Sequence, residues 1–233
     1  MEKISIGLPD GSRKEFDMGT TPLMIAQSIG EGLARAAIAA KINGTTTDLT
    51  TPITNESEIA ILTLKDKDGV EVFSHSSAHI MAAAVLRLFP EAKPTIGPAI
   101  EEGFYYDFYH LPFSSDDLER IEAEMKKIVD SDQVFEKIGL TKEAALDMFK
   151  DNKFKVEMIN EMDDSDITAY RTGDFIDLCR GPHVPSTKYI KAFKLTKVAG
   201  AYWRGDSKRE QLQRIYGVSF SDKKELKQFL ERM

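Results

Sequence analysis

The first part of the chain takes its fold from residues 3–30, KISIGLPDGSRKEFDMGTTPLMIAQSIG. Apolar and polar residues alternate over residues 3–8, as they do in a strand with one buried face, and Pro9-Asp10-Gly11 predicts the turn of a hairpin. Thr21-Pro22 is typical of a helix N-cap followed by the first helical residue. Gly30 predicts where that helix ends.

The next residues predict the strands that complete this domain. Asn43-Gly44 is a strong hairpin turn signal after a short strand, and residues 58–63 predict the last strand. Two strands, a helix and further strands are typical of a small β-grasp, ubiquitin-like domain, which we expect over residues 1–64. Residues 65–69 are polar and turn-prone, so the sequence predicts a domain boundary there.

A larger α+β domain is expected over residues 65–221, with an antiparallel sheet and long helices. We predict helices over residues 72–88, 114–130 and 141–149, and strands over residues 103–108, 154–159, 169–170, 175–178, 193–199 and 213–217. The strand at 154–159 would carry Lys155, because its residues alternate in polarity. Ser221 predicts the cap of a last helix over residues 222–233, the start of a linker toward a further domain.

Composition places the chain among globular proteins. Its 233 residues are 42% hydrophobic and 30% charged. It has no apolar run of membrane-spanning length and no signal-peptide stretch behind Met1, so we expect no membrane partner. A single cysteine excludes an internal disulfide and fits a reducing compartment, which predicts a cytoplasmic protein.

Charge is unevenly distributed along the chain. The net charge is −7, but residues 180–233 contain thirteen Lys and Arg against five Asp and Glu. A basic C-terminal segment on an acidic protein can bind a polyanion, or it can be a solvated surface with scattered lysines. Charge alone favours neither interpretation.

Two motifs concentrate the side chains that titrate near neutral pH. They are HSSAH at residues 75–79 and CRGPH at residues 179–183, which hold three of the four histidines and the only cysteine. On a helix, His75 and His79 lie one turn apart on the same face. Pro182 favours a strand end and tight turn for the second motif. Because imidazole and thiol groups are also soft metal ligands, the motifs predict one composite active site.

Three kinds of chemistry fit this site, and the residues alone leave them open. Two imidazoles, a thiol and a third imidazole are a normal tetrahedral zinc set. A histidine could instead activate Cys179 as a nucleophile, or the polar groups could position a water for metal-free hydrolysis. Zinc-protease chemistry is not expected, because Ser76 stands where H-E-x-x-H enzymes have glutamate. Packed residues with satisfied hydrogen bonds are the structural alternative.

A third motif, GAYWRGDS at residues 200–207, places the only tryptophan beside Arg204. Glycines permit a ligand to approach closely, and an aromatic ring with a neighbouring cation can stack on bases or meet phosphate. A buried Trp203 that anchors a hairpin explains the motif equally well.

Together the motifs resemble the bacterial threonyl-tRNA synthetase family. The resemblance rests on HSSAH, GFYYD at 103–107, DLCRGPHVP at 177–185, and GAYWRGDS followed by LQRIYG at 212–217. They stand in the order of that family's N-terminal region, and the similarity covers essentially the whole chain. The resemblance implies a TGS domain followed by an editing domain shared in outline with alanyl-tRNA synthetases. We expect the catalytic core that the family carries downstream to be absent.

The resemblance implies post-transfer editing, in which a positioned water hydrolyses the ester of mischarged seryl-tRNA(Thr) while threonyl-tRNA(Thr) is spared. The implied catalytic residues are His75, Lys155, Asp177, Cys179 and His183, with His79, Tyr106 and Gly97 along the substrate pocket. Lys155 and His183 would bind the terminal adenosine and polarise the ester. His75 and Cys179 would surround the seryl group. Asp177 would bind the seryl ammonium or orient a histidine.

Cofactors and partners follow from the same resemblance. Related alanyl editing domains hold zinc at the matching positions, whereas the threonyl site is regarded as zinc-free. We therefore expect no required metal and keep zinc at His75, His79, Cys179 and His183 as the alternative. ATP and the family's catalytic zinc would belong to the absent core. The expected partner is the 3′ end of tRNA(Thr) carrying serine, with this chain monomeric and its full-length parent a homodimer through the core.

Two other classes of function compete with editing. One is a non-catalytic tRNA-binding or regulatory module that uses the TGS-like domain and the basic C-terminal segment. The other is a zinc hydrolase that acts on a small ester.

Overall fold

The computed structural model describes residues 2–165 and 167–232. The chain forms two compact units: Met1–Phe73 with Gly181–Pro185, and Ser74–Arg180 with Ser186–Met233. Within the described residues, no helix combines the length and apolar character that a membrane crossing needs.

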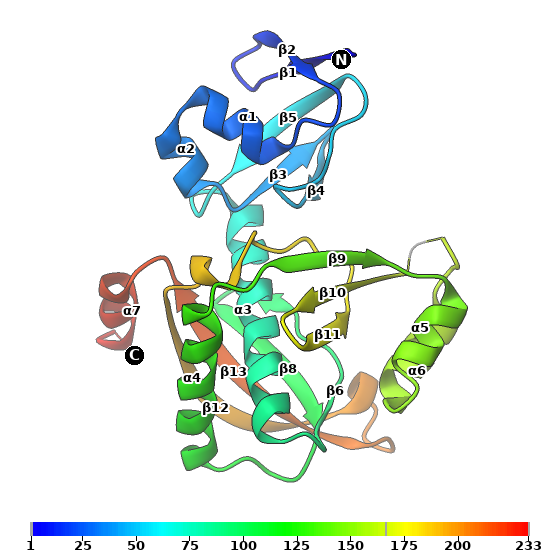
Figure 1. Ribbon diagram of the computed structural model, residues 1–233. Helices are drawn as coiled ribbons and strands as arrows, with labels where there is room; N and C mark the ends of the chain where they lie inside the picture. The colour runs from blue at the N-terminus through cyan, green and yellow to red at the C-terminus, as the bar shows by residue number, and fades with distance from the viewer. Residues whose placement is uncertain (1, 166, 233) are drawn as a thin grey trace. The chain divides into compact units, whose positions relative to one another are not determined.

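The first unit is a five-stranded sheet with two helices on one side (Figure 1). The strand order is β2-β1-β5-β3-β4, with β1 antiparallel to β2 and parallel to β5. The elements are β1 (Lys3–Gly7), β2 (Arg13–Asp17), α1 (Pro22–Ile29), α2 (Glu31–Ala36), β3 (Ala39–Ile42), β4 (Thr45–Thr47) and β5 (Ser57–Leu62). This is the expected β-grasp fold.

Local signals in this unit act as the sequence predicts. The Thr21 side chain accepts a hydrogen bond from the backbone of Met24 and caps α1, and Gly30 ends that helix. Asn43 and Gly44 have φ angles of 49° and 83°, the left-handed conformation that a tight hairpin between β3 and β4 requires.

The long helix α3 (Lys67–Leu88) continues from the first unit into the second after Phe73. It begins inside the polar stretch 65–69 that was expected to be a turn, and it ends before Pro90 as predicted. Asp66 explains the early start, because its carboxylate accepts from the backbone and hydroxyl of Thr63 and shapes the turn that leads into the helix.

The second unit has two sheets. The larger has the order β12-β13-β8-β6, with β7 also paired to β8, and the smaller has the order β11-β10-β9. Its strands are β6 (Lys93–Pro94), β7 (Ala99–Ile100), β8 (Gly103–Tyr109), β9 (Phe135–Gly139), β10 (Thr168–Thr172), β11 (Phe175–Leu178), β12 (Ala192–Tyr202) and β13 (Gln211–Phe220). All these pairings are antiparallel, so the expected α+β class is confirmed.

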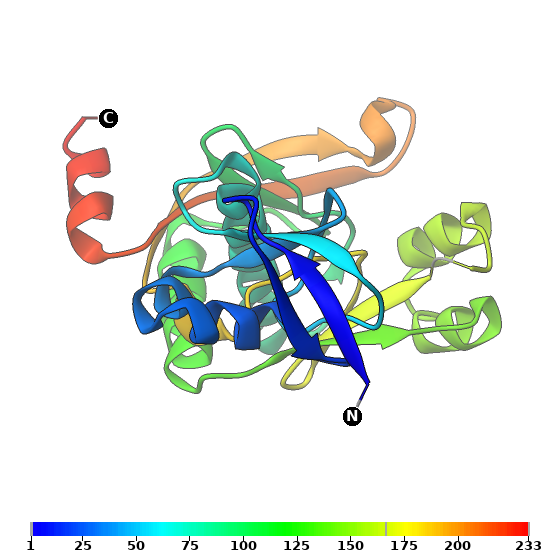
Figure 2. The same cartoon turned by 90° about the horizontal axis from the view of Figure 1, so that it is seen from above.

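Four further helices belong to this unit: α4 (Ser115–Asp130), α5 (Lys142–Met148), α6 (Lys153–Glu161) and α7 (Lys223–Leu230). Ser114 and Asp117 form a capping box at the start of α4. Helices α5 and α6 lie side by side beyond the smaller sheet in Figure 1. Figure 2 shows the β12–β13 hairpin running from α7 to a short helical turn at Trp203–Gly205. Both strands of the hairpin are longer than predicted.

Two local predictions are wrong. Residues 154–159 form part of α6 and not a strand, because the Asn152 side chain caps a helix in which Phe154, Lys155 and Ile159 are the buried residues. The last helix is capped by Asp222 and not by Ser221. It ends at Leu230, and residue 233, where the predicted helix ends, lies outside the described residues.

Candidate active site

Helix α3 presents two histidines on one face. The ring centroids of His75 and His79 lie 4.7 Å apart, with the rings nearly perpendicular. His79 is 3% exposed, whereas His75 is half-buried. Burial first, and then the electrostatic influence of the neighbouring His75 and Lys155, lowers the pKa of His79 well below its usual value. His79 is therefore a neutral imidazole at pH 7.

His75 is oriented by a backbone carbonyl and faces the thiol. The carbonyl oxygen of Gly97 lies 3.0 Å from Nδ1 of His75. Because a carbonyl oxygen only accepts, Nδ1 carries the proton, and Nε2 of the neutral ring is an acceptor. Nε2 lies 3.1 Å from the sulfur of Cys179. An oriented base beside a thiol can take a proton from the thiol or from a water bound next to it.

The hairpin of β10 and β11 positions Cys179. Its backbone N–H donates to the carbonyl oxygen of Thr168 at 3.1 Å, and the Thr168 hydroxyl donates to the Cys179 carbonyl oxygen at 2.6 Å. These bonds hold the cysteine just past the end of β11, in the strand end that the sequence predicts, with the residue half-buried. Asp177 lies two residues earlier, so its side chain leaves the strand on the same face.

Three polar side chains surround the Asp177 carboxylate. The ammonium of Lys155 lies 2.6 Å from Oδ1 as an ion pair. The Tyr106 hydroxyl donates a short hydrogen bond to Oδ2, and Nε2 of His79 is 3.6 Å from the same oxygen. Asp177 is 2% exposed, so Lys155 balances its charge in place of solvent. Burial and this carboxylate raise the pKa of Tyr106, which remains a hydrogen-bond donor.

Helix α6 directs Lys155 into the same interior. Its ammonium donates to the carbonyl oxygen of Thr95 at 2.6 Å and lies 3.5 Å from the Tyr106 hydroxyl. The Asp177 carboxylate lies beside the same ammonium as its ion-pair partner, and Lys155 is 1% exposed. Protein oxygen atoms therefore surround the Lys155 ammonium. In this arrangement the ammonium acts on the rest of the site through its contacts with Asp177 and Tyr106.

Sequence reasoning did not find Asn152 and Thr95, which position Lys155. Oδ1 of Asn152 accepts from the backbone N–H groups of Phe154 and Lys155, at 3.1 and 3.4 Å. Nδ2 of Asn152 donates to the carbonyl oxygen of Pro94 at 2.7 Å, next to Thr95. An asparagine before a helical segment is an N-cap signal, but the alternation over residues 154–159 masks it.

Gly97 and Tyr106 border the site together. A Cβ at Gly97 would overlap with the Tyr106 ring, so the close approach of these two residues requires glycine. Tyr106 is fully buried. Each residue makes a hydrogen bond to the histidine and carboxylate side chains of the site. The Gly97 carbonyl oxygen accepts from His75, and the Tyr106 hydroxyl donates to Asp177.

His183 lies in the segment Gly181–Pro185, which belongs to the first unit. Its backbone N–H donates to Oδ1 of Asp48 at 2.8 Å, and the residue is 1% exposed. Its role beside Cys179 follows from the sequence motif and stays a prediction.

Three potential metal ligands come together in the second unit. One ligand atom from each of His75, His79 and Cys179 lies within 4.8 Å of the others. Two imidazole nitrogens and a thiolate sulfur are donors that zinc accepts in a tetrahedral set with a fourth ligand. The donor chemistry therefore fits the zinc alternative.

A pocket of about 490 Å³ opens beside Cys179. Its lining combines apolar and charged side chains: Ile96, Met158, Glu161, Met162, Leu178, Cys179, Arg180, Trp203 and Arg204. Trp203 is 2% exposed and packs against Phe154, with ring centroids 5.0 Å apart. The indole is thus a buried anchor of the hairpin, one of the two interpretations of its motif.

Five cations of the basic C-terminal segment are paired with acids from earlier in the chain. The pairs are Lys188–Asp132, Lys194–Glu122, Arg204–Glu157, Arg209–Glu157 and Arg214–Asp107. The sequence count therefore overstates how basic this part of the surface is.

Two family models match the chain. Residues 4–63 match the TGS domain, and residues 167–216 match the Threonyl and Alanyl tRNA synthetase second additional domain. The second match contains Asp177, Cys179 and His183, and it also contains the Trp203-Arg204 motif.

Curated relatives are similar over the whole chain. Threonine–tRNA ligase of Pelobacter propionicus is 52% identical, with 100% of this chain and 37% of the relative covered. The ligase of Geobacter sp. (strain M21) is 50% identical with the same coverage, and that of Marinobacter nauticus is 50% identical over 98% of this chain and 36% of the relative. The chain thus spans a little over a third of the length of these relatives. It therefore belongs with the N-terminal regions of the threonine–tRNA ligases and carries a TGS domain and the second additional domain shared with alanyl-tRNA synthetases.

Proposed function

We propose that this chain hydrolyses the ester of mischarged seryl-tRNA(Thr) and spares threonyl-tRNA(Thr). The observation that carries the proposal is the His75–Cys179 pair, because Cys179 also lines the 490 Å³ pocket. An oriented imidazole acceptor beside a pocket is what water-dependent ester hydrolysis needs. The similarity to threonine–tRNA ligases supports the substrate class.

A second site is physically required for this substrate. Serine lacks only the methyl group of threonine, and such a difference supplies about 1–3 kcal/mol of discrimination in one binding step. A pocket that admits serine and rejects the extra methyl adds a second, independent selection. Editing by a separate domain is therefore the function that best fits a ligase for threonine.

His75 is the proposed general base. Nε2 takes a proton from a water held beside Cys179 while the water oxygen attacks the ester carbonyl carbon. The bond to the ribose oxygen then breaks, and that oxygen receives the proton from His75. The Gly97 carbonyl stabilises the intermediate imidazolium, because it accepts from Nδ1 at 3.0 Å.

We assign Lys155 and Asp177 to positioning. Each is nearly fully buried and bound to the other, which argues against direct contact with the seryl ammonium or the ester. Their ion pair fixes Tyr106 and faces neutral His79, and so it supports the α3 face that carries His75. His79, Tyr106 and Gly97 complete this support.

His183 is assigned to the proposed site from the CRGPH motif, in which it follows Cys179 by four residues. The zinc alternative takes His183 as the fourth ligand beside His75, His79 and Cys179. If zinc were bound, these residues would be its ligands, and the ion would supply an activated water. Metal analysis of the purified chain tests this alternative. Stoichiometric zinc whose removal abolishes deacylation would replace the zinc-free account.

Matched histidine variants test the base. We expect His75→Asn to abolish deacylation of seryl-tRNA(Thr), whereas His110→Asn, the histidine outside the site, keeps it. Cys179→Ala should retain substantial deacylation, because the attacking atom is a water oxygen. Equal activity of the two histidine variants would contradict the role of His75, and a dead Cys179→Ala that still folds would favour a covalent cysteine.

The TGS match favours a second function, tRNA binding without catalysis. Binding of tRNA(Thr) without loss of the seryl ester would support it over editing. The homodimer expected for the full-length parent stays a prediction.

A further inference from the structure

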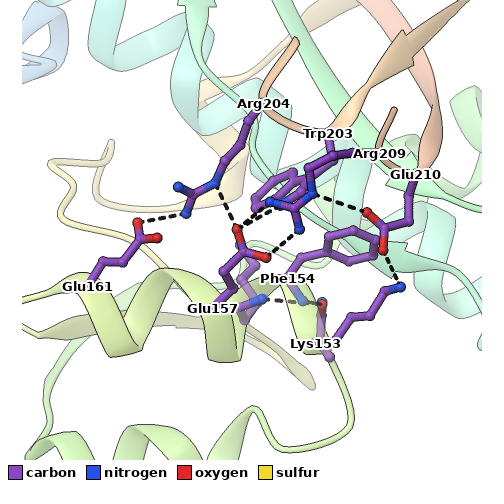
Figure 3. A network of polar contacts seen from close by, with 10 residues as sticks. Lys153, Phe154, Glu157, Glu161, Trp203, Arg204, Arg209 and Glu210 are labelled. Carbon is purple, nitrogen blue, oxygen red and sulfur yellow. Dashed lines mark hydrogen bonds and ion pairs between the residues drawn. The ribbon is translucent and has the colours of Figure 1, made fainter. Parts of the chain in front are cut away.

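The turn that carries Trp203 and Arg204 is fixed against helix α6 (Figure 3). Nε1 of Trp203 donates to Oε1 of Glu157 at 3.1 Å, and its ring packs edge-on against Phe154. Arg209 holds the same carboxylate with two hydrogen bonds, at 2.9 and 2.6 Å. Glu157 therefore connects α6 to the end of the β12–β13 hairpin through hydrogen bonds.

Arg204 is held in an uncommon conformation. Its φ angle is +55°, in the left-handed region that residues other than glycine occupy only where contacts fix them. Nε lies 3.0 Å from Oε1 of Glu157, and Nη2 donates to Oε2 of Glu161 at 2.7 Å. The guanidinium lies 5.4 Å from the Trp203 ring centroid. A strained backbone thus directs the Arg204 guanidinium toward α6.

The same contacts place a guanidinium on the wall of the pocket beside Cys179. Arg204, Glu161 and Arg180 all line it, whereas Arg209, on the other side of Glu157, does not. The apolar side chains of Met158 and other residues form the rest of the lining. An apolar surface next to two guanidinium groups fits a nucleoside joined to a phosphate.

We propose that Arg204 binds a backbone phosphate of the polynucleotide whose end enters this pocket, and that Glu161 holds the guanidinium until the phosphate replaces it. The proposal rests on the proposed function. Glu157 keeps the Nε side of Arg204 in place, since Arg209 holds this carboxylate charged, with its pKa lowered to about 2. The Nη atoms of Arg204, which now face Glu161, then turn to the phosphate as a bidentate hydrogen-bond donor.

Salt-dependent binding of tRNA(Thr) tests Arg204 without the need for hydrolysis. We expect Arg204→Asn, which tolerates positive φ, to raise Kd for uncharged tRNA(Thr) about tenfold and to reduce the salt slope of log Kd by about one. Arg204→Lys should keep the slope and recover part of the affinity. The control Arg120→Gln removes an equally charged, exposed side chain from α4, outside the pocket lining, and should change neither.

Glu161→Gln tests the exchange. Removing the competing carboxylate from an exposed ion pair should tighten tRNA binding about 1.5- to 5-fold, and this gain should disappear when Arg204→Asn is also present. In deacylation assays, Arg204→Asn should raise KM and leave kcat within about twofold, as expected for a binding group.

The outcomes separate this inference from the proposed function. Unchanged Kd and salt slope in Arg204→Asn overturn the phosphate contact, even if the chain hydrolyses seryl-tRNA(Thr). Loss of affinity in a chain that hydrolyses nothing supports the contact and defeats editing. Inorganic phosphate at millimolar concentration serves as the second probe. If phosphate displaces tRNA from the wild type only as much as its ionic strength predicts, the assignment of Arg204 to a polynucleotide phosphate stands. Specific, tight binding of free phosphate at Arg204 overturns that assignment.

Discussion

Replacing Lys155 by Met removes one half of the buried ion pair with Asp177. At their separation of 2.6 Å, an effective dielectric of about 20 gives a gross attraction of roughly 6 kcal/mol. Desolvation of both groups offsets much of it, since the side chains are 2% and 3% exposed. The variant leaves the Asp177 charge beside the Tyr106 hydroxyl and the neutral His79 ring, without its cationic partner. We therefore expect a loss of about 3–5 kcal/mol in the free energy of unfolding.

Tryptophan fluorescence during urea unfolding measures this loss in the relevant unit. Trp203 is the only tryptophan and packs on Phe154, the neighbour of Lys155 in α6. The double variant Lys155→Met/Asp177→Asn should lose less than the sum of the single variants, because no charge is left unbalanced.

The exposed pair Lys126–Asp130 provides the matched control, with side chains 66% and 64% exposed. Lys126→Met should change the free energy of unfolding by about 0.5 kcal/mol or less. The reasoning is refuted if Lys155→Met costs no more than Lys126→Met, or if the two site variants are simply additive.

Substitutions at three further positions test the residues that support the site. His79 stays neutral in the folded chain, whereas in the unfolded chain it binds a proton below its usual pKa of 6.5. The free energy of unfolding should therefore decrease as the pH falls below 6.5, by up to about 1.4 kcal/mol per pH unit. His79→Leu should flatten this slope in urea melts between pH 5 and 7.5; an unchanged slope contradicts burial as neutral imidazole. Asn152→Ala should lower the free energy of unfolding by about 1–2 kcal/mol. Asn152→Asp should lower it by less, because aspartate keeps the helix cap and loses only the hydrogen bond to Pro94. Equal losses in the two variants would contradict the contact with Pro94. Gly97→Ala should lower the melting temperature and slow deacylation, because the new methyl group overlaps with Tyr106; wild-type behaviour would contradict the close packing.

Turn and cap chemistry made most of the fold predictable. Asn43-Gly44 and Thr21-Pro22 have strong local preferences, and the structure uses both as expected. Residues 154–159 failed because a strict alternation of apolar and polar residues has the period of a strand. The helix wins there because Asn152 caps it and because Lys155, a charged residue at a buried position, finds Asp177 across the unit. Such a long-range partner leaves no trace in local periodicity.

The candidate site was predictable in its members and less so in its roles. The spacing of His75 and His79 on a helix indicates one face, and the structure shows it. The enclosure of Lys155 and Asp177 could not be read from the sequence, because it depends on Thr95 and Tyr106 arriving from other elements. The roles of these residues therefore changed from proposed ligand contacts to proposed positioning.

Hydrolysis of two aminoacyl-tRNAs by the unmodified chain tests the central claim most directly. Seryl-tRNA(Thr) and threonyl-tRNA(Thr) would be incubated in parallel with the chain at matched concentrations, and the remaining ester would be followed against spontaneous hydrolysis. The account predicts rapid loss of the seryl ester and near-background loss of the threonyl ester. Equal rates for the two esters, or no hydrolysis above background by a folded chain, would contradict it.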